Sequence, residues 1–237
     1  MAAKVAGSFK LLISEAKSGA ENMDIDLALF NDLEKGVIAP TIRFYSWKPA
    51  CVSFGYSQKP EDLIDPLSLK KLGWDIIKRP TGGGAAFHNT DEVAYSIVGR
   101  CDDEMFSAGI SASYKIISKA VIWGLAKLGI NAELSKTKKS IHSGVCFSYP
   151  ASHEIVVRGR KIVGSAQKRG KKAFLQHGSI FVSGVENIIL SAIKGTDVKV
   201  LKDSYVTIQD VLGRKPSFDE IVCAMKKSFA EALDVKL

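Results

Sequence analysis

The segment TGGGAAFHN, residues 81–89, constrains the fold most because three consecutive glycines lie between two predicted strands. These strands are expected at 75–80 and 92–98, where β-branched and aromatic residues are frequent. A phosphate-binding loop or a dinucleotide fingerprint leads instead from a strand into a helix. The segment therefore excludes both nucleotide motifs and predicts either a flexible turn or a loop whose N–H groups approach a ligand. Arg79, just before it, favours ligand binding.

Apolar periodicity predicts three helices. Apolar residues recur at three- and four-residue spacing at 23–36, at 108–128 and from Ser217 onward. In the first helix, Ile25, Leu29 and Leu33 form the expected buried face. Ser217 and Glu220 have the spacing of a capping box at the start of the last helix.

The order of the predicted elements indicates an α+β protein. Further strands are expected at 41–47, 51–56, 153–157, 161–167 and 174–182. Strands come first, a helix follows, and a hairpin group precedes the last helix, which predicts a mixed or largely antiparallel sheet flanked by helices. No internal repeat or linker divides the chain, so residues 1–237 are expected to form a single catalytic domain.

The chain of 237 residues carries a formal net charge of +8, which favours anionic partners. Basic runs at 136–139, 158–161 and 168–172 bracket one candidate site. Nucleic-acid binding is disfavoured, because aromatic readers are nearly absent from these runs. Charged residues interrupt the amino terminus, and no apolar run approaches the roughly 20 residues that span a bilayer. A cytoplasmic protein without membrane contact is expected.

The four cysteines lack CxxC spacing and the four histidines lack HExxH spacing, so we expect neither a metal site nor a disulfide framework. Cys51, Cys101 and Cys223 lie in apolar or strand contexts, where packing roles are expected. Catalysis is therefore expected to depend on organic side chains, without a cofactor.

Cys146 and Lys161 are the candidates for chemistry. Cys146 lies in a predicted loop near His142, His153 and the basic runs, and a thiol near positive charge ionises readily and attacks activated acyl groups. Lys161, at a predicted hairpin corner, could hold a carboxylate, a phosphate or a developing oxyanion. The residues alone leave other interpretations open, because Cys146 could be a small buried hydrophobe and Lys161 an exposed turn lysine.

Several motifs in fixed order suggest a family. RPTGGGAAFH, EVAYSIV, CFSYPASHEIVVRGRKIVGSAQKR and LQHGSI together resemble the catalytic domain of the lipoate and biotin protein ligase superfamily. Within it, the chain most resembles the cysteine-dependent octanoyl-[acyl carrier protein]:protein octanoyltransferases. The resemblance is strongest over residues 22–181 and implies a biotin/lipoate protein ligase-like fold.

The resemblance also implies roles for particular residues. Cys146 would take the acyl chain as a thioester, and Lys161 would lie beside the acyl carbonyl. The acyl-binding residues would be Arg79, Gly82, Gly83, Gly84, His88, Gly164, Ser165, Ala166, His177 and Gly178. The implied donor is octanoyl-acyl carrier protein, and the acceptor is a lysine of a lipoyl domain such as the glycine cleavage H protein or a 2-oxoacid dehydrogenase E2. Both partners are acidic in similar systems, so the basic runs would attract them.

An ATP-dependent lipoate-protein ligase is the alternative. This chain has a third glycine where the octanoyltransferases often have arginine, as the ligases do, and it has Asn89 where the family commonly has aspartate. The ligases usually carry an Asn-Asp pair where this chain has Ser152, His153 and Glu154, and they usually need a further small domain, which a separate chain could supply. A third type of octanoyltransferase places its cysteine well after the HG motif, and residues 181–200 contain none.

Overall fold

The computed structural model describes residues 8–135, 154–195 and 197–237. The strands, in chain order, are β1 (Lys10–Ile13), β2 (Thr41–Tyr45), β3 (Cys51–Phe54), β4 (Asp75–Lys78), β5 (Ala86–His88), β6 (Val93–Arg100), β7 (Glu133–Leu134), β8 (Ile155–Val157), β9 (Arg160–Arg169) and β10 (Ala173–Ile180). The helices are α1 (Gly19–Glu34), α2 (Pro60–Leu63), α3 (Pro66–Lys71), α4 (Ile110–Lys127), α5 (Asn187–Leu190), α6 (Val198–Ser204), α7 (Ile208–Leu212) and α8 (Phe218–Leu233). The predicted α+β class is confirmed.

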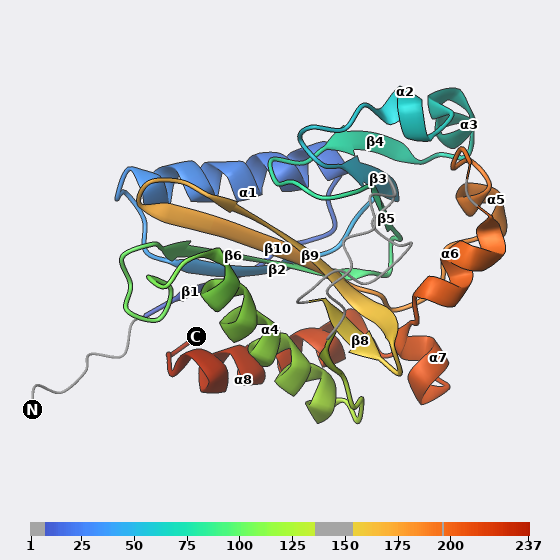
Figure 1. The fold of residues 1–237 in the computed structure, drawn as a ribbon. Coiled ribbons are helices and arrows are strands. Elements are labelled where there is room, and N and C mark those ends of the chain that lie inside the picture. Colours follow the sequence, from blue (N-terminus) through green and yellow to red (C-terminus); the bar gives the residue numbers. More distant parts are fainter. Residues whose placement is uncertain (1–7, 136–153, 196) are drawn as a thin grey trace, which may run out of the picture.

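The strands form a large and a small mixed sheet. The large sheet has the order β1-β2-β6-β10-β9-β8-β7, in which β1 and β2 run parallel and the other neighbours run antiparallel. The small sheet has the order β4-β3-β5, with β4 parallel and β5 antiparallel to β3. Figure 1 shows the small sheet above one end of the long β9–β10 hairpin.

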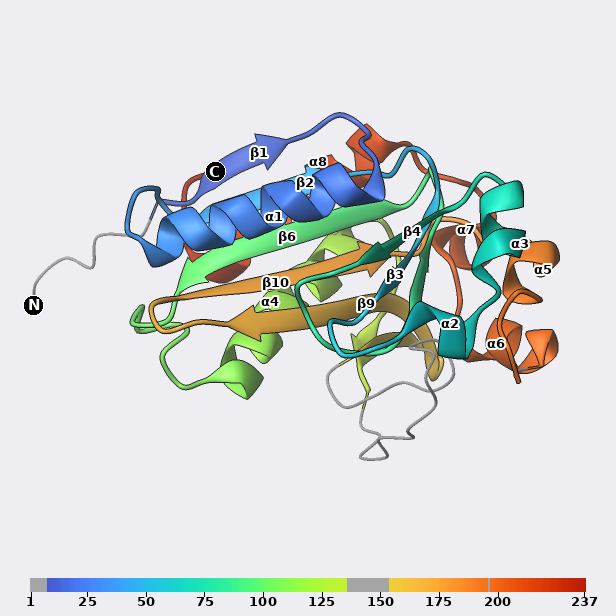
Figure 2. The ribbon, with the colours of Figure 1, turned by 90° about the horizontal axis from the view of Figure 1, so that it is seen from above.

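Helices cover both faces of the large sheet. Helix α1 lies against β6 and β10 on one face, as Figure 2 shows, while α4 and α8 pack together on the other. Gly124 of α4 permits this close packing, because a Cβ there would lie 2.4 Å from the sulfur of Met225 in α8. Apolar side chains from both helices and from the sheet form the main core, including Ile117, Val121 and Phe229.

Helix α1 differs in two ways from the sequence prediction. It begins at Gly19, where Ser18 and Glu21 form a reciprocal capping box. Its buried face carries Asn22, Met23, Asp26, Phe30 and Leu33, whereas Ile25 and Leu29 are only half-buried. The apolar spacing was therefore misleading, because polar groups of this helix pair with an arginine in the sheet and turn a different face inward.

Helix α8 begins at Phe218 as expected, but its capping box is incomplete. The hydroxyl of Ser217 accepts from the N–H of Glu220 at 3.1 Å. The carboxylate of Glu220 instead accepts two hydrogen bonds from Arg214, at 2.6 and 2.9 Å. A bidentate guanidinium is a stronger partner than one backbone N–H, which explains the difference.

Candidate active site

A pocket lies between the small and the large sheet. It contains about 510 Å³ of space, which includes the solvent at its open mouth. The small sheet and the adjoining segment contribute Ser53, Arg79, Ala86 and His88, and β9 and β10 contribute most of the opposite wall. Among the described residues, its lining is Met23, Tyr45, Trp47, Ser53, Arg79, Ala86, His88, Lys161, Gly164, Ser165, Ala166, His177, Gly178, Ser179 and Phe181.

The structure brings many of the residues named from sequence into the lining of this one pocket. They are Arg79, His88, Lys161, Gly164, Ser165, Ala166, His177 and Gly178. The described lining does not include Gly82, Gly83 or Gly84. Cys146, His142 and His153 lie outside the described residues. The roles assigned to these residues remain predictions.

Lys161 is not the exposed turn lysine of the simple sequence interpretation. It is the second residue of β9 and is only 1% exposed. Its ammonium pairs with the carboxylate of Glu154, which is also buried. Its carbonyl accepts from the N–H of Val206 at 2.8 Å, so that the strand is anchored to the segment after α6. The ammonium is therefore held in a water-poor pocket wall, where its charge acts strongly on neighbouring groups.

Gly164 provides the space for this ammonium. A Cβ on Gly164 would lie 2.9 Å from Cε and 3.2 Å from Nζ of Lys161. Gly164 is paired across the strands with Ser179 of β10. The side chain of Lys161 thus passes over the backbone of Gly164 and reaches the pocket through space that a side chain would otherwise fill.

Arg79 organises the glycine loop. Its guanidinium donates to the carbonyls of Gly82 and Gly84, both at 2.7 Å, and to the carbonyl of Ser53 at 3.0 Å. Gly83 between them has a φ of +92°, which a residue with a side chain adopts only under strain. The triplet therefore turns two loop carbonyls toward a buried cation, and the ligand-binding role expected for its N–H groups remains a prediction.

His177 belongs to a buried ionic network. Its Nδ1 lies 3.3 Å from Asp26, which also pairs with Arg43 at 2.9 Å and accepts from Ser96 and Tyr45. Burial opposes the charge on Asp26, but the contacts with His177 and Arg43 outweigh it and hold the pKa of this carboxyl below its usual value. Burial lowers the pKa of His177 below 6.5, although Asp26 acts in the opposite direction. His177 is therefore neutral at pH 7 beside an ionised carboxylate.

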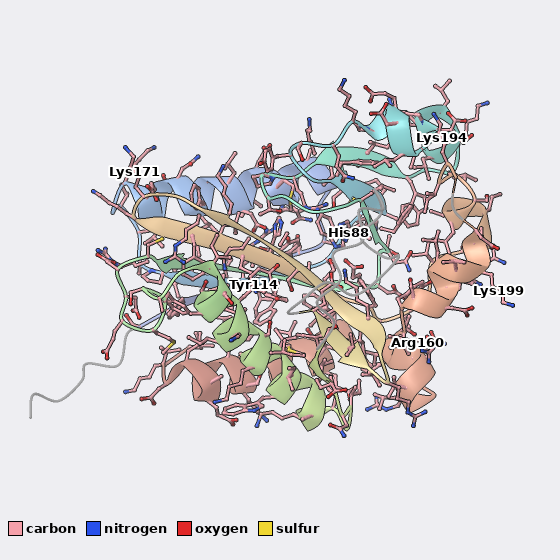
Figure 3. The ribbon with its side chains drawn as sticks, in the orientation of Figure 1. His88, Tyr114, Arg160, Lys171, Lys194 and Lys199 are labelled. Carbon is pink, nitrogen blue, oxygen red and sulfur yellow. The ribbon has the colours of Figure 1, made fainter. Side chains whose placement is uncertain are left out.

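His88 belongs to a second network, and Figure 3 shows this residue between the small sheet and the β9–β10 hairpin. Its Nδ1 lies 2.7 Å from Glu92 and 3.0 Å from the hydroxyl of Ser179. Its Nε2 lies 2.8 Å from the hydroxyl of Ser53. The ring of Trp47 stacks on the imidazole at 4.3 Å and donates its N–H to Glu92.

The sequence reasoning missed Asp26, Arg43, Glu92 and Glu154 as parts of the site. A usable signal existed, since Arg43 interrupts an apolar strand and Asp26 lies on the buried face of a helix. Buried charges occur mainly where they are paired.

The basic runs do not gather around one site. Arg160 and Arg169 are the ends of β9, which is about 30 Å long at roughly 3.3 Å per residue. Figure 3 accordingly shows Arg160 and Lys171 on opposite sides of the molecule. The run at 168–172 therefore lies far from Lys161, and the run at 136–139 lies outside the described residues. The expected bracketing of the site is wrong for the run at 168–172.

Three of the four cysteines can be placed. Cys51 is fully buried, and burial raises the pKa of its thiol well above the usual value. Burial also raises the pKa of Cys101. Cys223 is exposed on α8, so its expected packing role is wrong. Burial therefore disfavours the reactive thiolate form of Cys51 and Cys101.

The described residues lack two further kinds of feature. Residues 8–135, 154–195 and 197–237 contain no cluster of three or more histidine, cysteine, aspartate or glutamate side chains suited to a metal ion. Within that same part, every helix is too short or too polar to cross a membrane.

The fold and its pocket define the class of protein. A lipoate-protein ligase A bound with ATP superposes with a TM-score of 0.77 at 26% identity, covering 97% of this chain and 87% of that one. A bi-partite lipoate protein ligase from Thermoplasma acidophilum, described with its E2 lipoyl domain, shares the fold with a TM-score of 0.77 at 23% identity, covering 98% and 86%. This chain therefore has the fold of a lipoate-protein ligase catalytic domain.

The sequence comparison defines the family. Residues 18–230 match the family described as the lipoyl protein ligase A/B catalytic domain, and the chain belongs to that family. Octanoyltransferase LipM of Brevibacillus brevis is 35% identical, covering 97% of this chain and 88% of the relative. Octanoyltransferase LipM of Carboxydothermus hydrogenoformans is 37% identical, covering 92% and 84%.

Proposed function

We propose that this chain is an octanoyltransferase of protein lipoylation, which moves an octanoyl group through a thioester on Cys146 to a lysine of a lipoyl domain. The observation that carries the proposal is the 35–37% identity to octanoyltransferases over more than nine-tenths of this chain. The buried ammonium of Lys161 in the wall of a pocket suits acyl transfer, because the reacting carbonyl develops negative charge.

The first half-reaction loads the enzyme. The thiolate of Cys146 attacks the octanoyl thioester of acyl carrier protein, so that a new S–C bond forms and the carrier thiolate leaves. The proton lost by Cys146 balances the one taken up by the carrier thiol. A thioester is already activated, so this step needs no nucleotide.

The second half-reaction unloads the enzyme. The neutral ε-amino group of the acceptor lysine attacks the Cys146 thioester, an amide forms, and the thiol returns. The acceptor ammonium loses two protons in total, one of which returns to Cys146 while the other passes to solvent. Both half-reactions pass through a tetrahedral oxyanion, which needs a positively charged or hydrogen-bonding partner.

Lys161 is the proposed partner of that oxyanion. Glu154 and Val206 fix its side chain and its backbone, respectively, so little reorganisation is needed when charge develops. The arrangement fits a positioned cation better than a nucleophile, because an ammonium paired with a carboxylate has no lone pair available.

The proposed partners are octanoyl-acyl carrier protein as donor and a lipoyl-domain protein as acceptor. The glycine cleavage H protein and the E2 subunit of a 2-oxoacid dehydrogenase are the candidate acceptors. Their acidic character would complement exposed cations near Lys161, including Arg160 at the β8–β9 turn.

An ATP-dependent ligase is the second candidate, because a lipoate-protein ligase shares the fold at 26% identity. The test compares octanoyl-acyl carrier protein without nucleotide against free octanoate with ATP and magnesium, using a lipoyl domain as acceptor. We expect transfer from the thioester alone. Octanoylation that occurs only with free octanoate, ATP and magnesium would replace the proposal with the ligase.

A further inference from the structure

Two of the described residues that line the pocket are histidines, His88 and His177, although the ligand proposed for the pocket is an alkyl chain. An imidazole nitrogen facing such a chain would lose its hydrogen bond to water when the chain binds. The partners of each nitrogen therefore decide whether the wall is polar or apolar.

Both nitrogens of His177 point away from the pocket. Nδ1 faces Asp26 at 3.3 Å and Nε2 faces the hydroxyl of Thr81 at 2.7 Å. Neither Asp26 nor Thr81 belongs to the described pocket lining, whereas His177 does. The imidazole therefore presents its carbon atoms to the pocket.

The protonation state of His177 follows from the same contacts. Burial lowers the pKa of His177, so that the ring is neutral at pH 7 and carries one N–H. The Asp26 carboxylate can only accept, which places that hydrogen on Nδ1 and leaves Nε2 as an acceptor. Thr81 then donates its hydroxyl hydrogen to Nε2, and the ring has no unused polar atom.

We propose that Thr81, from behind the pocket wall, is a specificity-determining residue: its hydroxyl makes His177 an apolar part of the wall, so that the pocket selects an unsubstituted alkyl chain over a hydroxylated one. The inference rests on the proposed acyl transfer and extends it to the chemistry of the acyl chain. Thr81 positions His177 and does not itself touch the substrate.

The nitrogens of His88 are also occupied, but its partners Ser53 and Ser179 belong to the described pocket lining. Glu92 and the hydroxyls of Ser179 and Ser53 occupy its two nitrogens, and Trp47 covers a ring face. Here Ser53 also accepts from Arg79 at 3.2 Å, so that its removal would disturb a buried cation as well. Thr81 is therefore the cleaner position for a test.

The test compares Thr81→Val with Thr81→Ser. Valine keeps the shape of threonine and removes the hydroxyl, whereas serine keeps the hydroxyl and is the matched control. The donors are the N-acetylcysteamine thioesters of octanoate and of octanoate hydroxylated near its chain end. We expect Thr81→Val to raise KM for the octanoyl donor with little change in kcat. It should also reduce the preference in kcat/KM for octanoyl by about tenfold, or about 1.4 kcal/mol.

Thr81→Ser should retain the preference within about twofold, since the hydroxyl remains. Thr81→Ala removes the same hydroxyl and replaces the valine variant if that protein does not fold. An unchanged preference in Thr81→Val, or an equal change in Thr81→Ser, overturns the inference.

A spectroscopic measurement separates this inference from the proposed function. ¹⁵N NMR of labelled histidine should show Nε2 of His177 as a hydrogen-bonded acceptor in the unaltered protein and in Thr81→Ser. The resonance should shift toward that of a free acceptor in Thr81→Val. A chain without octanoyl transfer but with this shift refutes the proposed function and leaves the Thr81 bond established. Active protein whose Nε2 resonance is the same in all three proteins refutes the role of Thr81 alone.

Discussion

Replacing Lys161 by methionine separates its role in stability from its role in catalysis. The ammonium is removed while the unbranched length is kept, and Glu154 is left as a buried carboxylate without its lysine. The side chains of this pair are 2% and 8% exposed, so water compensates little. Breaking a buried ion pair by removing one partner costs about 3–5 kcal/mol in the free energy of unfolding.

This loss is large enough to measure by thermal unfolding. For a chain of this length, each kcal/mol corresponds to roughly 2–4 °C, so the melting temperature of Lys161→Met should fall by about 6–20 °C. Lys161→Met combined with Glu154→Gln removes both charges and should recover most of that loss, because the buried carboxylate that Lys161 neutralised is then also gone.

Catalysis should respond differently from stability. Both variants lack the ammonium, so octanoyl transfer should fall about a hundredfold in each, as after loss of one oxyanion-stabilising group. Single-turnover transfer, measured by intact mass at a temperature where both proteins are folded, gives the rates. A Lys161→Met protein with unaltered melting temperature would refute the buried-pair reasoning. Recovery of activity in the double variant would remove Lys161 from catalysis.

Three further predictions use other parts of the structure. Gly164→Ala should place a Cβ against Lys161 and reduce octanoyl transfer about tenfold, which transfer kinetics would measure. The free energy of unfolding should fall by less than about 1 kcal/mol, which urea unfolding would measure. Arg160→Glu should raise KM for the acyl carrier protein about tenfold at low salt. Lys171→Glu makes an equal charge change just beyond the far end of β9 and should alter this KM less than about twofold. Equal effects of the two substitutions on KM would contradict docking near Arg160. His177 has a folded-state pKa below its unfolded value of 6.5, so it stabilises the fold above pH 6.5 and this contribution is lost as pH falls from there toward the folded pKa. His177→Gln should flatten the fall in unfolding free energy over that window, and an unaltered slope would show that another group is responsible.

Local sequence patterns were sufficient to predict the longer helices and strands of the fold. The three predicted helices and the main strands correspond to α1, α4, α8 and to strands of both sheets. They succeeded because the period of apolar residues reflects burial on one side of an element. Short elements such as β1 and β5 were missed, because three or four residues carry too little periodicity.

The candidate site was predictable only in part. Motif resemblance named His88, Lys161 and His177, and all three line the same pocket. It did not reveal that Asp26 pairs with His177 across 151 positions of the chain, because such a contact depends on tertiary packing. The sequence likewise gives no sign that Lys161, next to a glycine-containing turn, is buried. Its burial accompanies a register irregularity in the β8–β9 pairing and an ion pair with Glu154, seven residues earlier.

The central claim is a covalent octanoyl thioester on Cys146, and intact mass spectrometry tests it most directly. The protein is mixed with octanoyl-acyl carrier protein in the absence of nucleotide and acceptor, and its mass is measured before and after hydroxylamine. The account predicts the addition of one octanoyl group, its removal by hydroxylamine, its localisation to Cys146 by peptide mapping, and no hydroxylamine-sensitive adduct on Cys146→Ser. Transfer at a normal rate by Cys146→Ser, or a thioester on another cysteine, would contradict it.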